Sequence, residues 1–106
     1  MKDLQKMMKQ AQKMALEMQK AQAELAEREV SGSAGGGAVT VKASGDLRVL
    51  AIEISPDVFD GEPDADDLEM LADTVTAAVN DALDKARALQ EETMGALGGG
   101  LGLPGM

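Results

Sequence analysis

Hydrophobic residues recur at spacings of three and four along the first 28 residues of the chain. The spacings alternate and average about 3.5 residues, which is the repeat of a coiled-coil seam. The segment contains no glycine or proline and consists mainly of strong helix formers. It predicts one helix from about Asp3 to about Arg28, roughly 39 Å long, part of which should project or pair with a partner. The predicted seam comprises Leu4, Met7, Ala11, Met14, Met18, Ala21 and Leu25.

The middle of the chain has the pattern of a β-hairpin. Residues 38–44 alternate apolar and polar side chains, residues 47–54 are rich in β-branched types, and Gly45-Asp46 lies between them as the turn. Val39 and Val41 share one face of the first strand. We interpret the face of the second strand that carries Leu50, Ile52 and Ile54 as the core face. The glycine-rich stretch 30–37 ends the first helix and leaves room for a short edge strand.

A second amphipathic helix follows a loop with two prolines. Asp64 is the expected N-cap, and Asp67 adds negative charge to the first turn. The helix should end near residues 93–95. The pattern predicts an α+β fold, with a long N-terminal helix, an antiparallel hairpin or three-stranded sheet, and a C-terminal helix. We expect one domain over residues 1–94 and a flexible Gly-rich tail over residues 95–106.

The composition predicts a thin hydrophobic core. Phe59 is the only aromatic residue in 106, and aromatic side chains contribute the largest buried area per residue. A small domain with a thin core and a long apolar seam gains burial from a second copy, so we expect a homodimer. The residues assigned to the core or dimer seam are Met7, Met14, Met18, Leu25, Leu50, Ile52 and Ile54.

Side chains that carry most enzyme chemistry are missing from this sequence. It has no histidine and no cysteine, which removes the usual general base, the thiol nucleophile and the soft metal ligands. The acidic loop at 57–66 fails the calcium-loop pattern, because Ala65 stands where glycine is required. The glycines of 100–105 match a dinucleotide-binding spacing without the strand and helix that give it meaning. We therefore expect no enzyme, no metal, no cofactor and no small-molecule substrate.

Charge is distributed unevenly. The net charge is −9, yet residues 1–23 carry five lysines against two acids, whereas residues 29–106 carry four basic residues against 15 acidic ones. The five lysines lie on the helix face turned away from the seam. Such a face is often only solvated, and it can also bind a phosphate backbone. Membrane binding ranks third, because the helix lacks anchoring aromatic residues and no run of about 18 apolar residues occurs.

A nucleic-acid partner would be restricted in kind. No aromatic residue accompanies the lysines, so single-stranded bases would have nothing to stack on, and arginine is scarce. This composition favours duplex DNA, bound through its phosphates with little sequence preference. The alternative is a protein–protein interaction module that uses the Met-rich seam. The candidate DNA-binding residues are Lys2, Lys6, Lys9, Lys13 and Lys20.

Five sequence segments, in this order and spacing, carry a family resemblance. They are Lys6–Met14, Gly35–Val41, Ile52–Pro56, Ala77–Ala86 and the closing Met94-Gly with Leu103–Met106. The chain resembles the YbaB/EbfC family of bacterial nucleoid-associated proteins over nearly its whole length. The resemblance implies a tweezer-like homodimer, with helices projecting from a joined β-sheet body. It also implies DNA binding in the nucleoid, in the cytoplasm, with effects on nucleoid shape, transcription or DNA protection.

Overall fold

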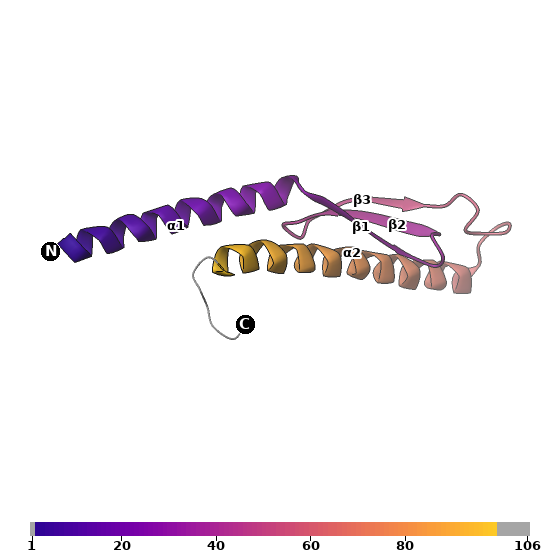
Figure 1. Ribbon diagram of the computed structural model, residues 1–106. Coiled ribbons are helices and arrows are strands. Elements are labelled where there is room, and N and C mark those ends of the chain that lie inside the picture. The colour runs from indigo at the N-terminus through magenta and orange to yellow at the C-terminus, as the bar shows by residue number, and fades with distance from the viewer. Residues whose placement is uncertain (1, 100–106) are drawn as a thin grey trace.

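The protein folds as a sheet crossed by one helix, with a second helix projecting from it (Figure 1). The computed structural model describes residues 2–99. The strands form an antiparallel sheet in the order β1-β2-β3, and α2 runs back across one face toward α1. This arrangement confirms the predicted α+β class and the short edge strand. The elements are α1 (Lys2–Glu27), β1 (Glu29–Ala34), β2 (Val39–Ser44), β3 (Val49–Ile54) and α2 (Ala65–Gly99).

The core lies where α2 crosses β1 and β2. Val39 and Val41 of β2 are fully buried, together with the small residues Ala78 and Ala82 of α2. Gly32 of β1 brings the two layers into contact, because a Cβ built on it would lie 2.3 Å from the backbone nitrogen of Ala82. The backbone of α2 therefore rests directly on β1, and small residues on both sides permit this approach.

The apolar face of β3 is not part of this core. Ile52 and Ile54 lie opposite Val41 and Val39 and therefore on the side of the sheet that α2 covers, but both remain 45% exposed. Leu50 is skipped at a bulge in the ladder and is 55% exposed. The reason is that α2 packs over β1 and β2 and makes few contacts with β3. The interpretation of these three residues as the core face of a single chain is therefore wrong.

The turn between β2 and β3 is longer than the predicted Gly45-Asp46. It occupies residues 45–48, and β3 begins at Val49. The backbone N–H of Ser44 donates to the carbonyl of Arg48 at 2.8 Å, while Leu47 takes a positive φ of 69°. The N–H of Gly45 donates to the carbonyl of Arg28 at 2.9 Å. This last bond attaches the turn to the end of α1.

The beginning of α2 was predicted correctly, but its end was not. Asp64 is the N-cap as expected: its Oδ1 accepts from the N–H of Asp67 at 2.8 Å, and the Asp67 carboxylate accepts in return from the N–H of Asp64 at 3.0 Å. The predicted end near residues 93–95 is wrong, because the helix continues to Gly99. A glycine costs a helix only about 1 kcal/mol, which is too little to stop it at Gly95. Residues 100–106 of the predicted tail lie outside the described residues.

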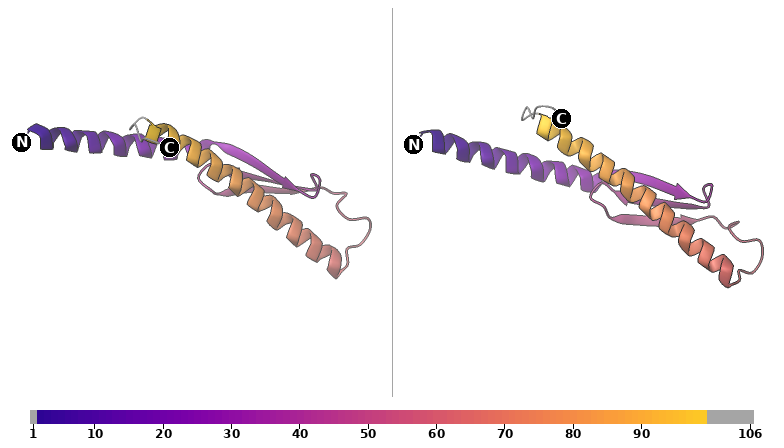
Figure 2. Two further views of the ribbon diagram at one scale, coloured as in Figure 1. Left: turned by 60° about the horizontal axis from the view of Figure 1, so that its bottom comes forward. Right: turned by 90° about the horizontal axis from the view of Figure 1, so that it is seen from below.

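The molecule is elongated because α1 leaves the body. Its extents are 75 × 27 × 17 Å and its radius of gyration is 20.5 Å, against about 13 Å for a compact chain of this length. Only Ala21 and Leu25 of α1 are buried, whereas residues 2–20 are all exposed. Both views in Figure 2 show α1 extending beyond the body. The expectation that part of this helix projects is thus confirmed.

Candidate nucleic-acid interface

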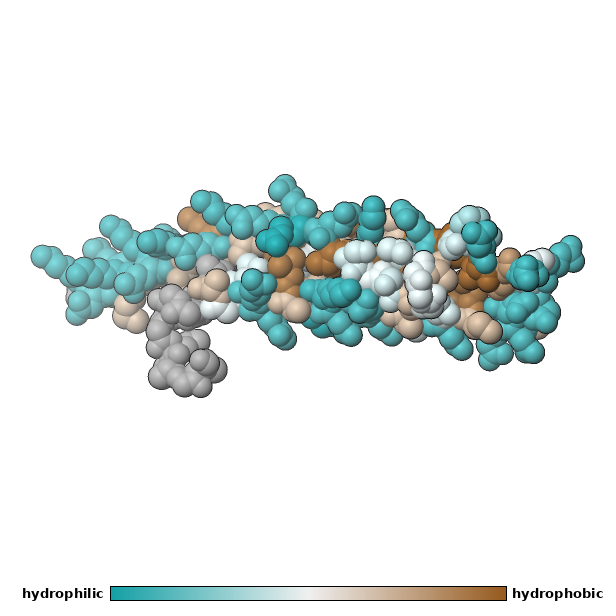
Figure 3. All heavy atoms as spheres, turned by 45° about the vertical axis from the view of Figure 1, so that its right-hand side comes forward, coloured by the Kyte–Doolittle hydropathy of each residue, from teal (hydrophilic) through white to brown (hydrophobic). Residues whose placement is uncertain are grey.

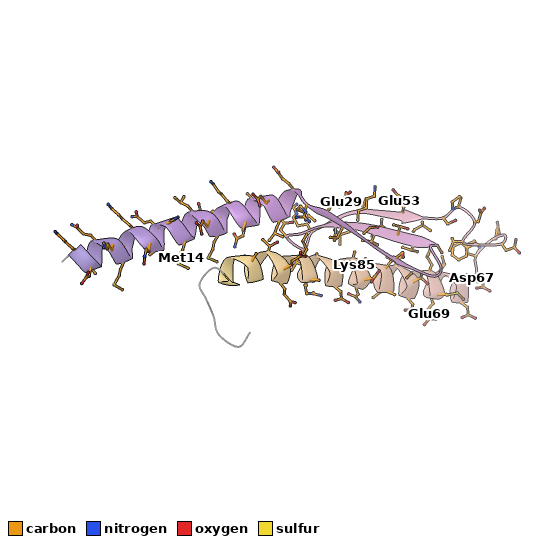
Figure 4. The ribbon with its side chains drawn as sticks, in the orientation of Figure 1. Met14, Glu29, Glu53, Asp67, Glu69 and Lys85 are labelled. Atoms are coloured by element: carbon orange, nitrogen blue, oxygen red, sulfur yellow. The ribbon has the colours of Figure 1, made fainter. Side chains whose placement is uncertain are left out.

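Residues 2–20 of α1 form a free helical segment, which we call the arm. All five lysines predicted to bind DNA lie on it, and each is exposed. They occupy heptad positions c and f, on the side of the helix turned away from the apolar seam. Nitrogen-tipped side chains project along the length of α1 in Figure 4, while Met14 projects on the side where α2 lies. The arm therefore separates a basic face from an apolar one.

The arm lysines are not neutralised by neighbouring carboxylates. Among residues 2–99 the ion pairs are Lys85 with Asp81 at 3.2 Å and Arg87 with Asp84 at 3.0 Å, both within α2. The backbone N–H of Ser33 and the ammonium of Lys85 donate to Asp81 and lower the pKa of its carboxyl. The two basic residues of α2 are thus engaged internally, whereas the five arm lysines are the largest group of lysines and arginines without an ion pair among residues 2–99.

Negative charge gathers at the opposite end of the molecule. No lysine or arginine occurs between Arg48 and Lys85, a stretch that contains 11 acidic residues. Asp67 and Glu69 lie at the end of α2 farthest from the arm (Figure 4). A polyanion would be attracted to one end of this molecule and repelled by the other. The charge distribution therefore makes the arm the candidate surface for a phosphate backbone.

Lys20 differs from the other four lysines in its surroundings. It lines a groove of about 430 Å³ between α1 and α2, together with Glu17, Glu24, Arg28 and Glu92. Three carboxylates share this groove with the Lys20 ammonium, so its field is weakened locally. Glu17 and Glu24 are neighbours of Lys20 on α1 itself, whereas Glu92 comes from α2 and cannot be predicted from the spacing along α1. Arg28 is the basic residue of the groove that sequence reasoning missed.

The predicted seam divides into two parts. Leu25 is 3% exposed at the base of α1, where its carbonyl and side chain lie beside Gly45. Farther out, Leu4, Met7, Met14 and Met18 are between 40% and 65% exposed. Leu25 therefore belongs to the interior of the single chain. Ala21 is buried as well, and the seam from Leu4 to Met18 is open along the arm.

Two further observations bear on the kind of protein this is. Within the described part of the chain, no three metal-ligating side chains gather into a cluster that could hold an ion. No helix in residues 2–99 has the length and apolar character needed to cross a bilayer. An acidic α+β body with a projecting lysine-bearing helix offers one surface that attracts a polyanion, which is what a small nucleic-acid-binding protein requires.

Comparison with known proteins supports this class and narrows it. The YbaB/EbfC DNA-binding family matches residues 1–101, and the chain belongs to this family. A nucleoid-associated protein of Alkaliphilus metalliredigens is 51% identical over 100 residues, which cover 94% of this chain and 84% of that protein. A nucleoid-associated protein of Clostridium novyi is 54% identical over 100 residues, which also cover 94% of this chain and 84% of that protein. The resemblance inferred from the five sequence segments is therefore confirmed.

The fold is also shared at much lower identity. A crystal structure of an uncharacterized protein from Helicobacter pylori superposes with a TM-score of 0.72 at 15% identity, and covers 86% of this chain and 91% of that one. The family is defined by DNA binding and is not an enzyme class. Membership does not favour the alternative of a protein–protein interaction module.

Proposed function

We propose that this protein binds duplex DNA through the lysines of the arm, with little sequence preference, and thereby changes how the DNA is organised. The role is non-enzymatic, and its place is the nucleoid in the cytoplasm, with consequences for gene expression or DNA protection. The observation that carries the proposal is a projecting helix with five exposed lysines that no carboxylate pairs, on a chain of net charge −9. The names of the relatives support the nucleoid role.

The shape of the arm fits contact with phosphates rather than bases. The arm is about 28 Å long, somewhat less than the roughly 34 Å of one turn of duplex DNA. Lysine is a flexible point charge, without the fork of donors with which arginine reads guanine edges. The arm carries no aromatic residue that could stack on a base. Binding of this kind depends on charge and on spacing more than on sequence.

Salt dependence tests the proposal directly. Fluorescence anisotropy with a 30-base-pair random duplex should show binding at low salt, with log K falling linearly as log salt rises. Each arm that neutralises four or five phosphates contributes a slope of about −4. A second duplex of unrelated sequence serves as the control and should give the same affinity within about twofold. Absence of binding at low salt would overturn the proposal.

A second copy covering β3 is the other part of the proposal. Ile52 and Ile54 form an exposed apolar stripe on the face of the sheet that α2 crosses, and Leu71, Val75 and Val79 of α2 are only partly buried. Hydrophobic residues lie along the body in Figure 3, whereas hydrophilic residues dominate the end that carries the arm. β3 is also an edge strand without the proline or lysine that commonly blocks edge pairing. We infer that a homodimer buries this stripe, with Leu50 at its margin.

Substituting Ile52→Asp together with Ile54→Asp should give a folded monomer. Neither side chain belongs to the core of the single chain, so the fold should survive while the apolar stripe becomes charged. Light scattering after gel filtration should report a mass of 11.0 kDa, half that of the wild type. Ala51→Asp, on the other face of β3, is the matched control and should remain dimeric. A double variant that keeps the mass of the wild type contradicts the assignment.

A further inference from the structure

The exposed seam of the arm has the repeat of a helix that pairs with another helix. Leu4, Met7, Ala11, Met14 and Met18 occupy the a and d positions of consecutive heptads. No part of residues 2–99 covers them, because every residue from 2 to 20 is exposed. Leu4 and Met7 are 61% and 65% exposed, which is unusual for large apolar side chains on one helix stripe. The seam is an unfilled packing surface.

The charges around the seam permit a second arm to lie against it. Positions e and g flank a coiled-coil seam and decide which partners repel one another. Here position e holds Met8 and Ala15, and position g holds Asp3, Gln10 and Glu17. All lysines are at c and f, on the far side of the helix. Two arms can therefore pack seam to seam without bringing their positive charges together.

We propose that arms of two protein molecules pair through this seam on DNA and hold two duplexes together. The proposal rests on the DNA-binding function proposed above. In a two-helix pair with a and d inside, the f positions of the two helices point in opposite directions. Lys2 and Lys9 of each helix would then face a different duplex. Pairing of two arms thus places two basic faces back to back, and each face can hold its own duplex.

The second copy is the partner that the seam fits best. A heptad repeat is complementary to a helix with the same repeat, and the seam carries no charge that would select a charged partner. The free segment holds fewer than the three to four heptads that a coiled coil needs to be stable alone. Pairing is therefore weak in solution and becomes effective when DNA concentrates the arms. Bridging should accordingly rise steeply with the density of bound protein.

A polar seam tests the proposal without altering charge. The variant carries Met7→Gln, Met14→Gln and Met18→Gln, and glutamine has about the same helix propensity as methionine. Beads that carry one duplex should capture a second, labelled duplex through the wild-type protein. The variant should lose this capture about tenfold or more while binding a single duplex within about twofold of the wild type. Leu16→Gln, at position f and 61% exposed, is the control and should still bridge.

The absence of cysteine from the chain allows a second, direct readout. Ala11→Cys places a single thiol in the seam, and Gln12→Cys places one on the outer surface one residue away. On DNA under mild oxidation, the first variant should form disulfide-linked pairs and the second should not. Equal crosslinking of the two, or bridging by the methionine variant at the wild-type level, overturns arm pairing but leaves DNA binding intact. A protein that binds no single duplex overturns the proposed function itself.

Discussion

Replacing Lys6, Lys9 and Lys13 by glutamate is expected to abolish duplex binding and to leave the fold intact. The three substitutions turn the net charge of residues 1–23 from +3 to −3. Each lysine is exposed and makes no ion pair, and glutamate is as good a helix former as lysine, so little stability should be lost. Anisotropy at low salt should detect no complex, because an acidic arm on an acidic body repels the phosphate backbone.

A matched variant shows whether DNA affinity depends on where the positive charge lies or only on the net charge of the chain. Lys42→Glu, Lys85→Glu and Arg87→Glu change the net charge equally but lie on the body. Lys42 makes no ion pair among the described residues, and the partners of Lys85 and Arg87 are exposed, so losing these two pairs should cost little stability. This variant should bind DNA with moderately reduced affinity. Equal loss in both variants would mean that overall charge controls binding, and wild-type affinity in the arm variant would show that the arm is not the interface.

Structural features that depend on residues close together in the sequence were predicted correctly. The helical repeat of α1 and the Asp64 N-cap of α2 depend on residues within one or two turns of each other. The exposure of Ile52 and Ile54 depends instead on where α2 crosses the sheet. That position is set by Gly32, some 20 residues earlier in the chain, which admits the helix backbone over β1. Alternation along β3 indicates two faces but not whether anything covers them.

In the candidate site, too, the features set by one helix were predictable and those set by distant residues were not. The lysine face follows from the period of one helix, so the sequence predicts it fully. The environment of Lys20 follows only in part: Glu17 and Glu24 are its neighbours on α1, but Glu92 reaches the same groove from α2, more than 70 residues away. Leu25 shows the same limit, since only the packing of the β2–β3 turn against α1 reveals that the seam closes at its base.

The acidic body repels DNA and so favours an approach of DNA to the arm. DNA near the body meets a stretch of 11 acidic residues without a compensating lysine or arginine, whereas DNA near the arm meets unpaired lysines. A net negative charge is therefore compatible with DNA binding, because most arm lysines lie far from the acidic residues of 49–84 in a molecule 75 Å long. The screening length in physiological salt is about 8 Å, so the far end scarcely weakens attraction at the arm.

Gly32→Val is expected to unfold the protein or to destabilise it severely. Strand propensity alone predicts the opposite, because valine favours strands and glycine weakens them. A Cβ at this position would lie 2.3 Å from the nitrogen and 2.7 Å from the Cα of Ala82, and 2.8 Å from the carbonyl oxygen of Ala78. These are backbone atoms of α2, which cannot rotate away as a flexible side chain can. The helix must lift from β1, and the contacts of the buried alanines are lost with it.

The measurement is thermal unfolding followed by circular dichroism. We expect Gly32→Val to lose about 3 kcal/mol or more, which lowers Tm by at least about 12 °C in a chain of this size. Gly95→Ala is the matched glycine control, since a Cβ there meets nothing within 4 Å and alanine favours the helix. That variant should gain up to about 1 kcal/mol. A Gly32→Val protein as stable as the wild type would show that α2 does not rest on β1. The position of α2 would then no longer explain why β3 is exposed.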